Sequence, residues 1–253
     1  MPRLISLLPV FAALTLITTN GASAADVRLA VAANFTDTAQ ELIRVFADTS
    51  GLQATASYGS TGKLYAQILN GAPFDVFLSA DTERTERLER TGQGVGGSRF
   101  TYAQGRLVLW SPEPRLLDAP EAWLASDSFA RLAIANPKTA PYGQAAQQVL
   151  TRLGLWVPLQ RRLVRGDSIA QTFQFVATAN AQAGFIAFSQ LRAWDGDEGS
   201  RWLIPPGYYS PINQQAILLT HGEKNDAARQ WLSFLRSETA RSIIERYGYT
   251  TPN

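Results

Sequence analysis

Short apolar stretches alternate with amphipathic stretches along most of the chain, and this alternation constrains the fold more than any other feature. The segment 27–33 (VRLAVAA) is short and apolar, as a buried parallel strand is. The next segment, 36–48, places its apolar residues at helical spacing, and Gly51 marks its end. Strands that alternate with helices in this way are typical of α/β domains, in which helices cover both faces of a parallel sheet.

The same patterns predict the remaining elements. Further strands are expected at 52–58, 75–79, 106–110, 132–135, 162–164, 184–188 and 212–219. Further helices are expected at 63–70, 81–91, 142–153, 168–179, 225–235 and 238–247. No internal repeat or low-complexity linker interrupts them, so the chain forms either one wide sheet or two smaller α/β lobes.

The first 24 residues have the three parts of a secretory signal peptide. Arg3 gives a positive start, residues 4–18 form an uncharged apolar run, and residues 22–24 (ASA) have the small-x-small cleavage pattern. The apolar run is shorter than the ~20 residues of a membrane-spanning helix. We therefore expect cleavage after residue 24 or 25, export to the bacterial periplasm and a mature chain of about 229 of the 253 residues.

The composition excludes several kinds of chemistry. Cysteine is absent, which removes thiol nucleophiles and Cys-ligated metals, and the single histidine, His221, nearly excludes His-based triads and metal sites. The pI near 9.0 reflects a small arginine excess without a basic tail, so no nucleic-acid partner is predicted. Neither a G-x-S-x-G nor a Walker A motif is present, which leaves an exported enzyme as a minor alternative.

The stretch 58–64 (YGSTGKL) looks like a phosphate-binding loop but does not satisfy that motif. The motif G-x-x-x-x-G-K-[ST] needs glycine and a hydroxyl residue where this chain has Ser57 and Leu64. The loop nevertheless joins a predicted strand to a predicted helix, where unsatisfied N–H groups and the helix dipole favour an anion. Ordinary N-capping by Ser60 or Thr61 is the alternative explanation.

Four other loops repeat this arrangement, at residues 32–36, 79–82, 141–143 and 167–169. Because ligands bind at the carboxyl ends of strands in open α/β sheets, the five loops can converge on one cleft. Together they predict a small-anion site built from amides and hydroxyls. Tyr208 and Tyr209 could instead indicate a ferric-ion site, but no His/Glu partner set accompanies them.

The order of the motifs AANFTD, YGSTGKLYAQI, NGAPFDVFLSAD, IANPKTAPYG, GDSIAQT and GFIAF resembles the periplasmic molybdate-binding proteins of ABC transporters, from about residue 26 to the C-terminus. The resemblance implies a two-lobed α/β binding protein of the class II periplasmic type, and not an enzyme. Each lobe would be a mostly parallel sheet flanked by helices, with the ligand cleft between the lobes. Lobe I would comprise residues 25–105 plus 219–253 and lobe II residues 106–218, with crossings near 105–106 and 215–219.

The resemblance also implies the contacts to the ligand. The family holds a tetrahedral oxyanion by hydrogen bonds alone, without a cofactor and without a direct bond from protein to molybdenum. Carried over to this chain, the contacts fall on Asn34 in the first loop, the hydroxyl and amide of Thr61, the amides of Ala80 and Ile169, and the phenol of Tyr142.

This chain departs from the commoner family pattern at several positions. Many relatives have serine where Asn34 and Thr61 stand, and many place the ligand tyrosine where this chain has Phe188. A subset has that tyrosine in the APYG loop, as here, which is why Tyr142 is the expected donor. Ala33 stands where some of that subset have threonine, so one side-chain donor is missing.

The implied function is capture of molybdate, and of tungstate, by a monomer that delivers the anion to a membrane permease. Molybdate carries no proton at neutral pH, whereas hydrogen phosphate facing only donors would lose about 1–3 kcal/mol for its unpaired proton. Asp81 and Asp167 are expected to point away from the anion as helix caps, and Lys63 to face solvent. The alternatives are a carrier of sulfate, phosphate or ferric ion, a sensor domain, or the exported enzyme.

Overall fold

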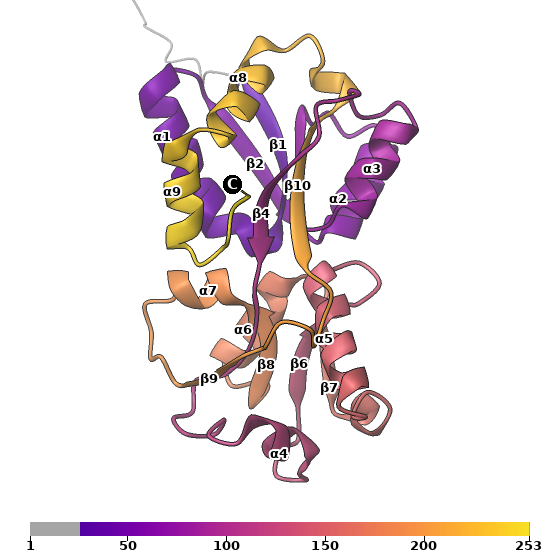
Figure 1. The fold of residues 1–253 in the computed structure, drawn as a ribbon, viewed down its shortest axis with the longest axis vertical. Coiled ribbons are helices and arrows are strands. Elements are labelled where there is room, and N and C mark those ends of the chain that lie inside the picture. Colours follow the sequence, from indigo (N-terminus) through magenta and orange to yellow (C-terminus); the bar gives the residue numbers. More distant parts are fainter. Residues whose placement is uncertain (1–25, 253) are drawn as a thin grey trace, which may run out of the picture.

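The computed structural model describes residues 26–252, so the predicted signal peptide at 1–24 lies outside the described residues. The chain forms two lobes stacked along its long axis (Figure 1), each with a five-stranded sheet. Strand order is β2-β1-β3-β10-β4 in lobe I and β7-β6-β8-β5-β9 in lobe II. No helix within residues 26–252 is long and apolar enough to cross a membrane.

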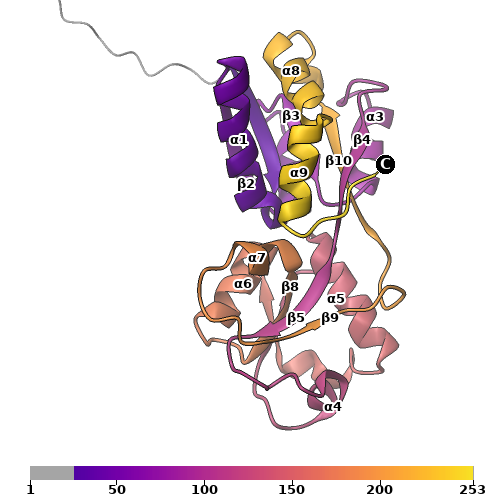
Figure 2. The same ribbon diagram turned by 60° about the vertical axis from the view of Figure 1, so that its left-hand side comes forward.

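Lobe I is formed by two separate parts of the chain. Its first part contains β1 (Val27–Ala32), the 3-10 helix η1 (Ala33–Phe35), α1 (Thr36–Ser50), β2 (Ala54–Gly59), α2 (Thr61–Leu69), β3 (Val76–Ser79), α3 (Glu83–Arg90) and β4 (Phe100–Gly105). Its second part contains β10 (Ile212–Leu218), η3 (Thr220–Gly222), α8 (Asp226–Leu235) and α9 (Glu238–Arg246). Helices α1, α8 and α9 cover one face of the sheet (Figure 2), and α2 and α3 cover the other (Figure 1).

Lobe II is formed by the segment between these two parts. It contains β5 (Leu107–Ser111), α4 (Pro120–Ala125), β6 (Leu132–Ala135), α5 (Pro141–Arg152), η2 (Pro158–Arg161), β7 (Leu163–Gly166), α6 (Ile169–Ala177), β8 (Ala183–Ala187), α7 (Phe188–Ala193) and β9 (Ser200–Leu203). The two-lobed α/β architecture therefore agrees with the predicted fold class.

Both sheets are mixed rather than mostly parallel. Strand β1 runs parallel to β2 and β3, and β6 runs parallel to β7 and β8. Strand β10 runs antiparallel to β3 and β4, and β5 runs antiparallel to β8 and β9. The parallel strands are joined through helices, as parallel pairs require, whereas the antiparallel strands are those that carry the chain between the lobes.

The second crossing between the lobes lies earlier than the sequence predicted. Strand β10 pairs with β3 and β4 and starts opposite Gly105, which places residues 212–218 in the sheet of lobe I. The predicted lobe II, 106–218, includes these residues, and the predicted crossing near 215–219 lies within or after them, so neither agrees with this pairing. The apolar pattern of β10 indicates a buried strand but carries no information about which sheet it joins. We therefore propose that lobe II ends before Ile212.

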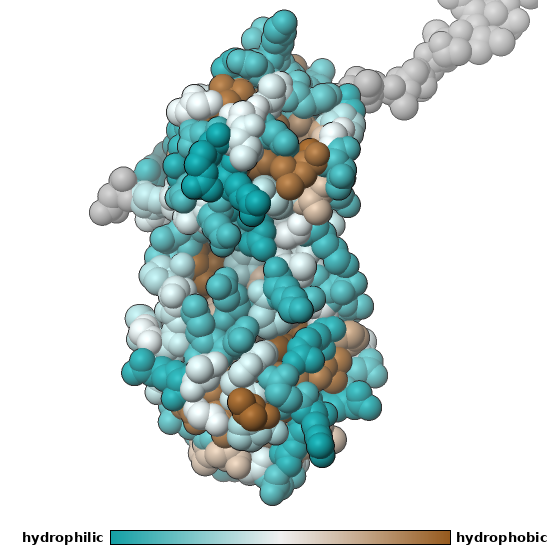
Figure 3. Space-filling view, turned by 90° about the vertical axis from the view of Figure 1, so that its right-hand side faces the viewer, coloured by the Kyte–Doolittle hydropathy of each residue, from teal (hydrophilic) through white to brown (hydrophobic). Residues whose placement is uncertain are grey.

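Each lobe packs around its own aromatic core. In lobe I, Phe46 of α1 meets Trp231 of α8 edge to face, with ring centroids 5.2 Å apart, and both are fully buried. In lobe II, Trp110 of β5 stacks on Phe173 of α6 at 5.3 Å. On the side shown in Figure 3 the surface is largely hydrophilic, with small and separate hydrophobic areas. At the boundary, the core of lobe II extends to Ala32, Ala33 and Ala80 of lobe I, so the two lobes are in apolar contact there.

Candidate functional site

The loops that follow the parallel strands of the two lobes meet at the lobe boundary. The N–H of Gly62 donates to the carbonyl of Thr139 at 2.8 Å, and the Ser189 hydroxyl donates to the Asn34 carbonyl at 2.8 Å. Helices α6 and α7 of lobe II both pack against η1 of lobe I. The lobes therefore contact each other directly, which is a closed arrangement.

The structure brings the five predicted anion contacts together at this boundary. Ala80, Tyr142 and Ile169 pack in one apolar cluster that spans both lobes. Thr61 is hydrogen-bonded to Ala80, and Asn34 is connected to Tyr142 through one side chain, that of Gln214. All five are at most 3% exposed: Asn34, Thr61, Ala80, Tyr142 and Ile169.

The side-chain nitrogen of Asn34 is fully occupied by protein partners. This nitrogen, Nδ2, donates to Gln214 Oε1 at 2.9 Å and to the Tyr249 hydroxyl at 3.0 Å, which uses both amide hydrogens. The backbone carbonyl of Asn34 accepts from the hydroxyls of Ser189 and Tyr249. The backbone N–H of Asn34 lies in the first turn of η1, where amides have no intrahelical acceptor. This N–H is therefore the donor of Asn34 that its side-chain partners leave unused.

Thr61 and Ala80 form a donor–acceptor pair. The N–H of Ala80 donates to Thr61 Oγ1 at 3.2 Å in a fully buried position. Because the hydroxyl accepts this bond, its own hydrogen remains free to donate. The amide of Ala80 is engaged with Thr61 in this structure, and a direct contact of Ala80 with the anion stays a prediction.

Tyr142 lies in the first turn of α5 and reaches across the boundary to lobe I. Its hydroxyl accepts from Gln214 Nε2 at 3.4 Å. Burial is the main cause that raises the pKa of Tyr142 well above its ordinary value, so the phenol keeps its proton at neutral pH. A Cβ at position 105 would lie 2.1 Å from this hydroxyl, which explains why β4 ends in Gly105.

Ile169 is the first residue of α6, so its N–H also has no intrahelical acceptor. The cap of this helix is Ser168, whose hydroxyl accepts from the N–H of Gln171 at 3.3 Å. The Ile169 carbonyl accepts from Gln190 Nε2 at 3.1 Å, which ties the start of α6 to α7. This leaves the N–H of Ile169 available at the boundary.

The charged neighbours of the site differ in part from expectation. Asp81 accepts from the N–H of Arg84 at 3.1 Å and pairs with its guanidinium, so it caps the first turn of α3 as predicted. Asp167 does not cap α6. It forms a salt bridge of 2.7 Å with Lys63 of lobe I, across the boundary. Lys63 is exposed to solvent as predicted, and its ammonium group in addition connects the two lobes through this salt bridge.

Sequence reasoning missed several polar groups at this boundary. Ser60 Oγ and Thr139 Oγ1 are buried and have no hydrogen-bond partner within the described part of the chain. Ser60 stands in the loop 58–64, where the sequence indicates only a helix cap. Its hydroxyl forms no capping bond to α2, so its hydrogen is not used by that helix.

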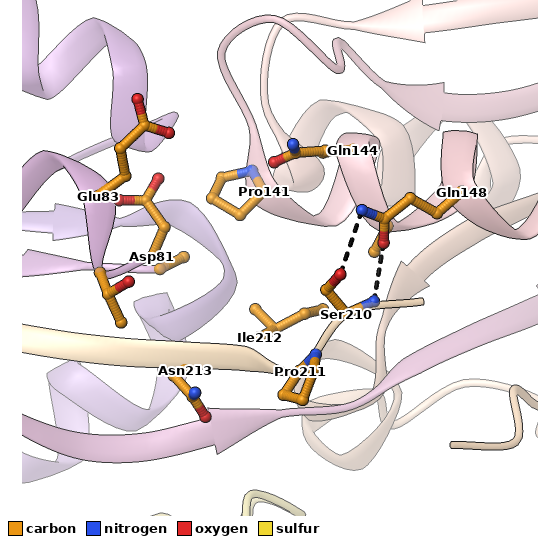
Figure 4. A pocket seen from close by; sticks show the side chains of 12 residues that line it. Asp81, Glu83, Pro141, Gln144, Gln148, Ser210, Pro211, Ile212 and Asn213 are labelled. Carbon is orange, nitrogen blue, oxygen red and sulfur yellow. Dashed lines mark hydrogen bonds between the residues drawn. The ribbon is translucent and has the colours of Figure 1, made fainter. Parts of the chain in front are cut away.

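A groove of about 220 Å³ opens beside the site, between α3, α5 and the segment that leads into β10. In Figure 4, Asp81 and Glu83 lie on one side of the groove, and Pro141 and Gln144 lie on the other. The segment at Ser210 forms a third side of the groove, and the N–H of Ser210 donates to Gln148 Oε1 at 2.8 Å. The groove reaches Ala80 but none of the other four predicted contacts, and its two carboxylates do not suit an anion.

Comparison with known proteins supports the resemblance seen in the sequence. Residues 27–250 match the family described as bacterial extracellular solute-binding proteins. The molybdate-binding protein ModA of Azotobacter vinelandii is 50% identical over 230 residues, covering 90% of this chain and 91% of the relative. The chain belongs to the ModA family. This is a family of solute-binding proteins and not of enzymes.

Two further relatives show how far this similarity extends. ModA of Rhodobacter capsulatus is 46% identical over 230 residues, covering 91% of this chain and 90% of the relative. The solved periplasmic molybdate-binding protein of Azotobacter vinelandii superposes with a TM-score of 0.86 at 41% identity, covering 90% of this chain and 100% of that chain.

The fold alone does not determine the ligand. The sulfate-binding protein SubI of Mycobacterium tuberculosis has the same fold, with a TM-score of 0.75 at 12% identity, covering 90% of this chain and 87% of that one. The choice of anion by this ModA-family chain must therefore come from the residues at the lobe boundary.

Proposed function

We propose that this chain is a periplasmic binding protein that captures molybdate, and tungstate, and delivers the anion to the membrane permease of an ABC transporter. One structural observation carries the proposal. The hydroxyls of Thr61 and Tyr142, one from each lobe, each accept a bond from a protein N–H and so keep their own hydrogen for a ligand. Relatives at 50% and 46% identity are named molybdate-binding proteins.

The proposed site consists of uncharged donors. They are the backbone N–H groups of Asn34 and Ile169, the hydroxyl and N–H of Thr61, and the hydroxyl of Tyr142, with Ser60 as an additional hydroxyl. Hydrogen bonds to a charged group contribute about 1.5–3 kcal/mol each. Micromolar binding needs about 8 kcal/mol, so five such donors can support it after the costs of association.

The donor-only character favours an oxyanion without a proton. Molybdate, tungstate and sulfate are such dianions, whereas hydrogen phosphate carries a proton that needs an acceptor. Leaving that proton unpaired costs about 1–3 kcal/mol. Sulfate has shorter bonds than molybdate, so it cannot reach donors of both lobes together, and cavity size separates these two anions.

The anion would hold the lobes in the closed arrangement. Since its donors come from both lobes, it binds the closed state better than an open one and shifts the equilibrium toward closure. The closed form is then the form that the permease recognises. We further propose that the chain is exported by the signal peptide 1–24, acts as a monomer in the periplasm, and needs neither a cofactor nor a nucleic-acid partner.

Thermal unfolding of the chain without residues 1–24 tests this function. A ligand that binds only the native state stabilises it by about 2.7 kcal/mol at a concentration of 100 Kd. Molybdate and tungstate should raise the unfolding temperature most, sulfate less, phosphate least, and ferric ion not at all. A larger shift with phosphate or ferric ion than with molybdate would contradict the proposal.

A further inference from the structure

We propose that Gln214 is the positioning residue that turns the hydroxyl of Tyr142 into an obligatory donor, and that the site thereby rejects oxyanions that carry a proton. This inference rests on the proposed function. Gln214 lies on β10, in the sheet of lobe I, and its side chain is fully buried. It is hydrogen-bonded to predicted anion contacts of both lobes, Asn34 in lobe I and Tyr142 in lobe II.

The orientation of the Gln214 amide is determined by its neighbours in lobe I. Its Oε1 accepts from Asn34 Nδ2 at 2.9 Å and from the Tyr102 hydroxyl at 3.1 Å. Asn34 Nδ2 in turn donates to Tyr249, a residue of the C-terminal segment. Because two donors point at the oxygen of the amide, its nitrogen must face the other way, toward Tyr142.

This orientation dictates what the hydroxyl of Tyr142 can do. An amide NH₂ group only donates, so the phenol oxygen accepts from Gln214 Nε2 and directs its single hydrogen elsewhere. Burial keeps the phenol protonated by raising its pKa, so the hydrogen is present at neutral pH. Gly105 leaves room for the contact, because a Cβ there would lie 2.8 Å from Gln214 Nε2 and 2.1 Å from the phenol oxygen.

The consequence is a choice between oxyanions of the same charge. A phenol that already accepts from Gln214 presents a hydrogen to the anion, which suits an oxygen of molybdate. A P–OH group in the same position would meet a donor, and its proton would be left without an acceptor. Gln214 thus acts on specificity through Tyr142, without touching the anion itself.

The variant Gln214→Glu reverses this arrangement with little change in shape. A carboxylate still accepts from Asn34 and Tyr102, so the bonds within lobe I are kept. Its second oxygen can only accept when ionised, so it takes the hydrogen of Tyr142, and the phenol oxygen then faces the ligand as an acceptor. The matched control is Gln215→Glu on the same strand, where Gln215 is bonded to Thr85 and Arg99 and not to Tyr142.

The experiment is calorimetric titration at pH 8.5 with molybdate and, by competition, with hydrogen phosphate. The introduced charge repels both dianions alike, so the ratio of their affinities isolates the hydrogen bond. We expect Gln214→Glu to lower that ratio by at least about 10-fold, corresponding to one charge-assisted hydrogen bond. The ratio should be unchanged in Gln215→Glu. In a Tyr142→Phe background, Gln214→Glu should no longer alter the ratio.

The outcomes separate this inference from the proposed function. If the wild-type chain binds no molybdate, the proposed function fails and the inference fails with it. If the wild type binds molybdate but Gln214→Glu weakens both anions by the same factor, only the inference is overturned. Should Gln214→Glu not fold, Gly105→Ala tests the same contact from β4, because its methyl group displaces the Tyr142 hydroxyl. An unchanged ratio in that variant overturns the inference as well.

Discussion

Replacing Gly62 by alanine adds one methyl group whose closest neighbours are in the opposite lobe. A Cβ at this position would lie 3.0 Å from both the Cα and the carbonyl oxygen of Thr139, and 3.2 Å from an Arg84 nitrogen. Arg84 is a flexible side chain that can move away, whereas the backbone of Thr139 cannot do so without opening the boundary. The substitution therefore penalises the closed arrangement and leaves an open one untouched.

The magnitude follows from this crowding. Contacts of 3.0 Å are shorter than ordinary van der Waals contacts, and inserting a methyl group into a packed region typically costs about 1–3 kcal/mol. Since only the closed state bears this cost, molybdate should bind about 5–150-fold more weakly. The free protein should be no less stable, because alanine is favoured over glycine in helices by up to about 1 kcal/mol. The two effects therefore have opposite signs.

Two measurements on the same variant check this prediction. Calorimetric titration gives the molybdate affinity, and thermal unfolding without ligand gives the stability of the free protein. Gly96→Ala is the matched control, because a Cβ at Gly96 meets nothing within 4 Å. If Gly62→Ala bound molybdate as tightly as the wild type, the claim that the anion-bound lobes close with Gly62 against Thr139 would be refuted.

Three further predictions follow from the same site. Thr61→Asp should abolish molybdate binding, since it places a carboxylate against the dianion; calorimetry showing unchanged affinity would remove Thr61 from the site. Asp167→Asn should weaken molybdate binding by no more than about 5-fold, because exposed ion pairs contribute about 0.2–1 kcal/mol, and 1 M salt should erase the difference. A loss that persists in high salt would contradict this electrostatic explanation. Burial raises the pKa of Tyr102 above its ordinary value, so the unfolded chain releases this proton first as the pH rises above 10. The contribution of Tyr102 to the free energy of unfolding is therefore fully present below pH 10 and is lost above it. When chemical denaturation is repeated at several pH values above 10, the free energy of unfolding of Tyr102→Phe should fall less steeply with pH, by about 1.4 kcal/mol per pH unit. An unchanged dependence on pH would contradict this explanation.

Most of the regular structure could be predicted from local patterns. The strand at Leu132–Ala135 and the helix at Thr36–Ser50 were predicted within two residues, because an uninterrupted apolar run and a single apolar helix face are local signals. The strands β4 (Phe100–Gly105) and β9 (Ser200–Leu203) and the short helices α4 (Pro120–Ala125) and α7 (Phe188–Ala193) were missed. Their patterns are too short, and they are stabilised by the elements they pack against.

The candidate site was predictable in its loops but not in its connections. The repeated strand–loop–helix pattern indicated where Thr61 and Tyr142 would lie, since loops after parallel strands meet at one edge of the sheet. No local pattern links Gln214 to Asn34, 180 residues away, or Lys63 to Asp167, 104 residues away. Such pairs depend on how the two lobes approach each other, which the periodicity of the sequence does not encode.

The most direct test of the proposed function is calorimetric titration of the chain lacking residues 1–24 with molybdate, in the absence and presence of excess sulfate. A donor-only site shared by two lobes predicts one molybdate bound per chain, with affinity in the micromolar range or tighter and only weak competition by sulfate. The absence of binding heat with molybdate, together with saturable binding of sulfate, would contradict the assignment of this site to molybdate.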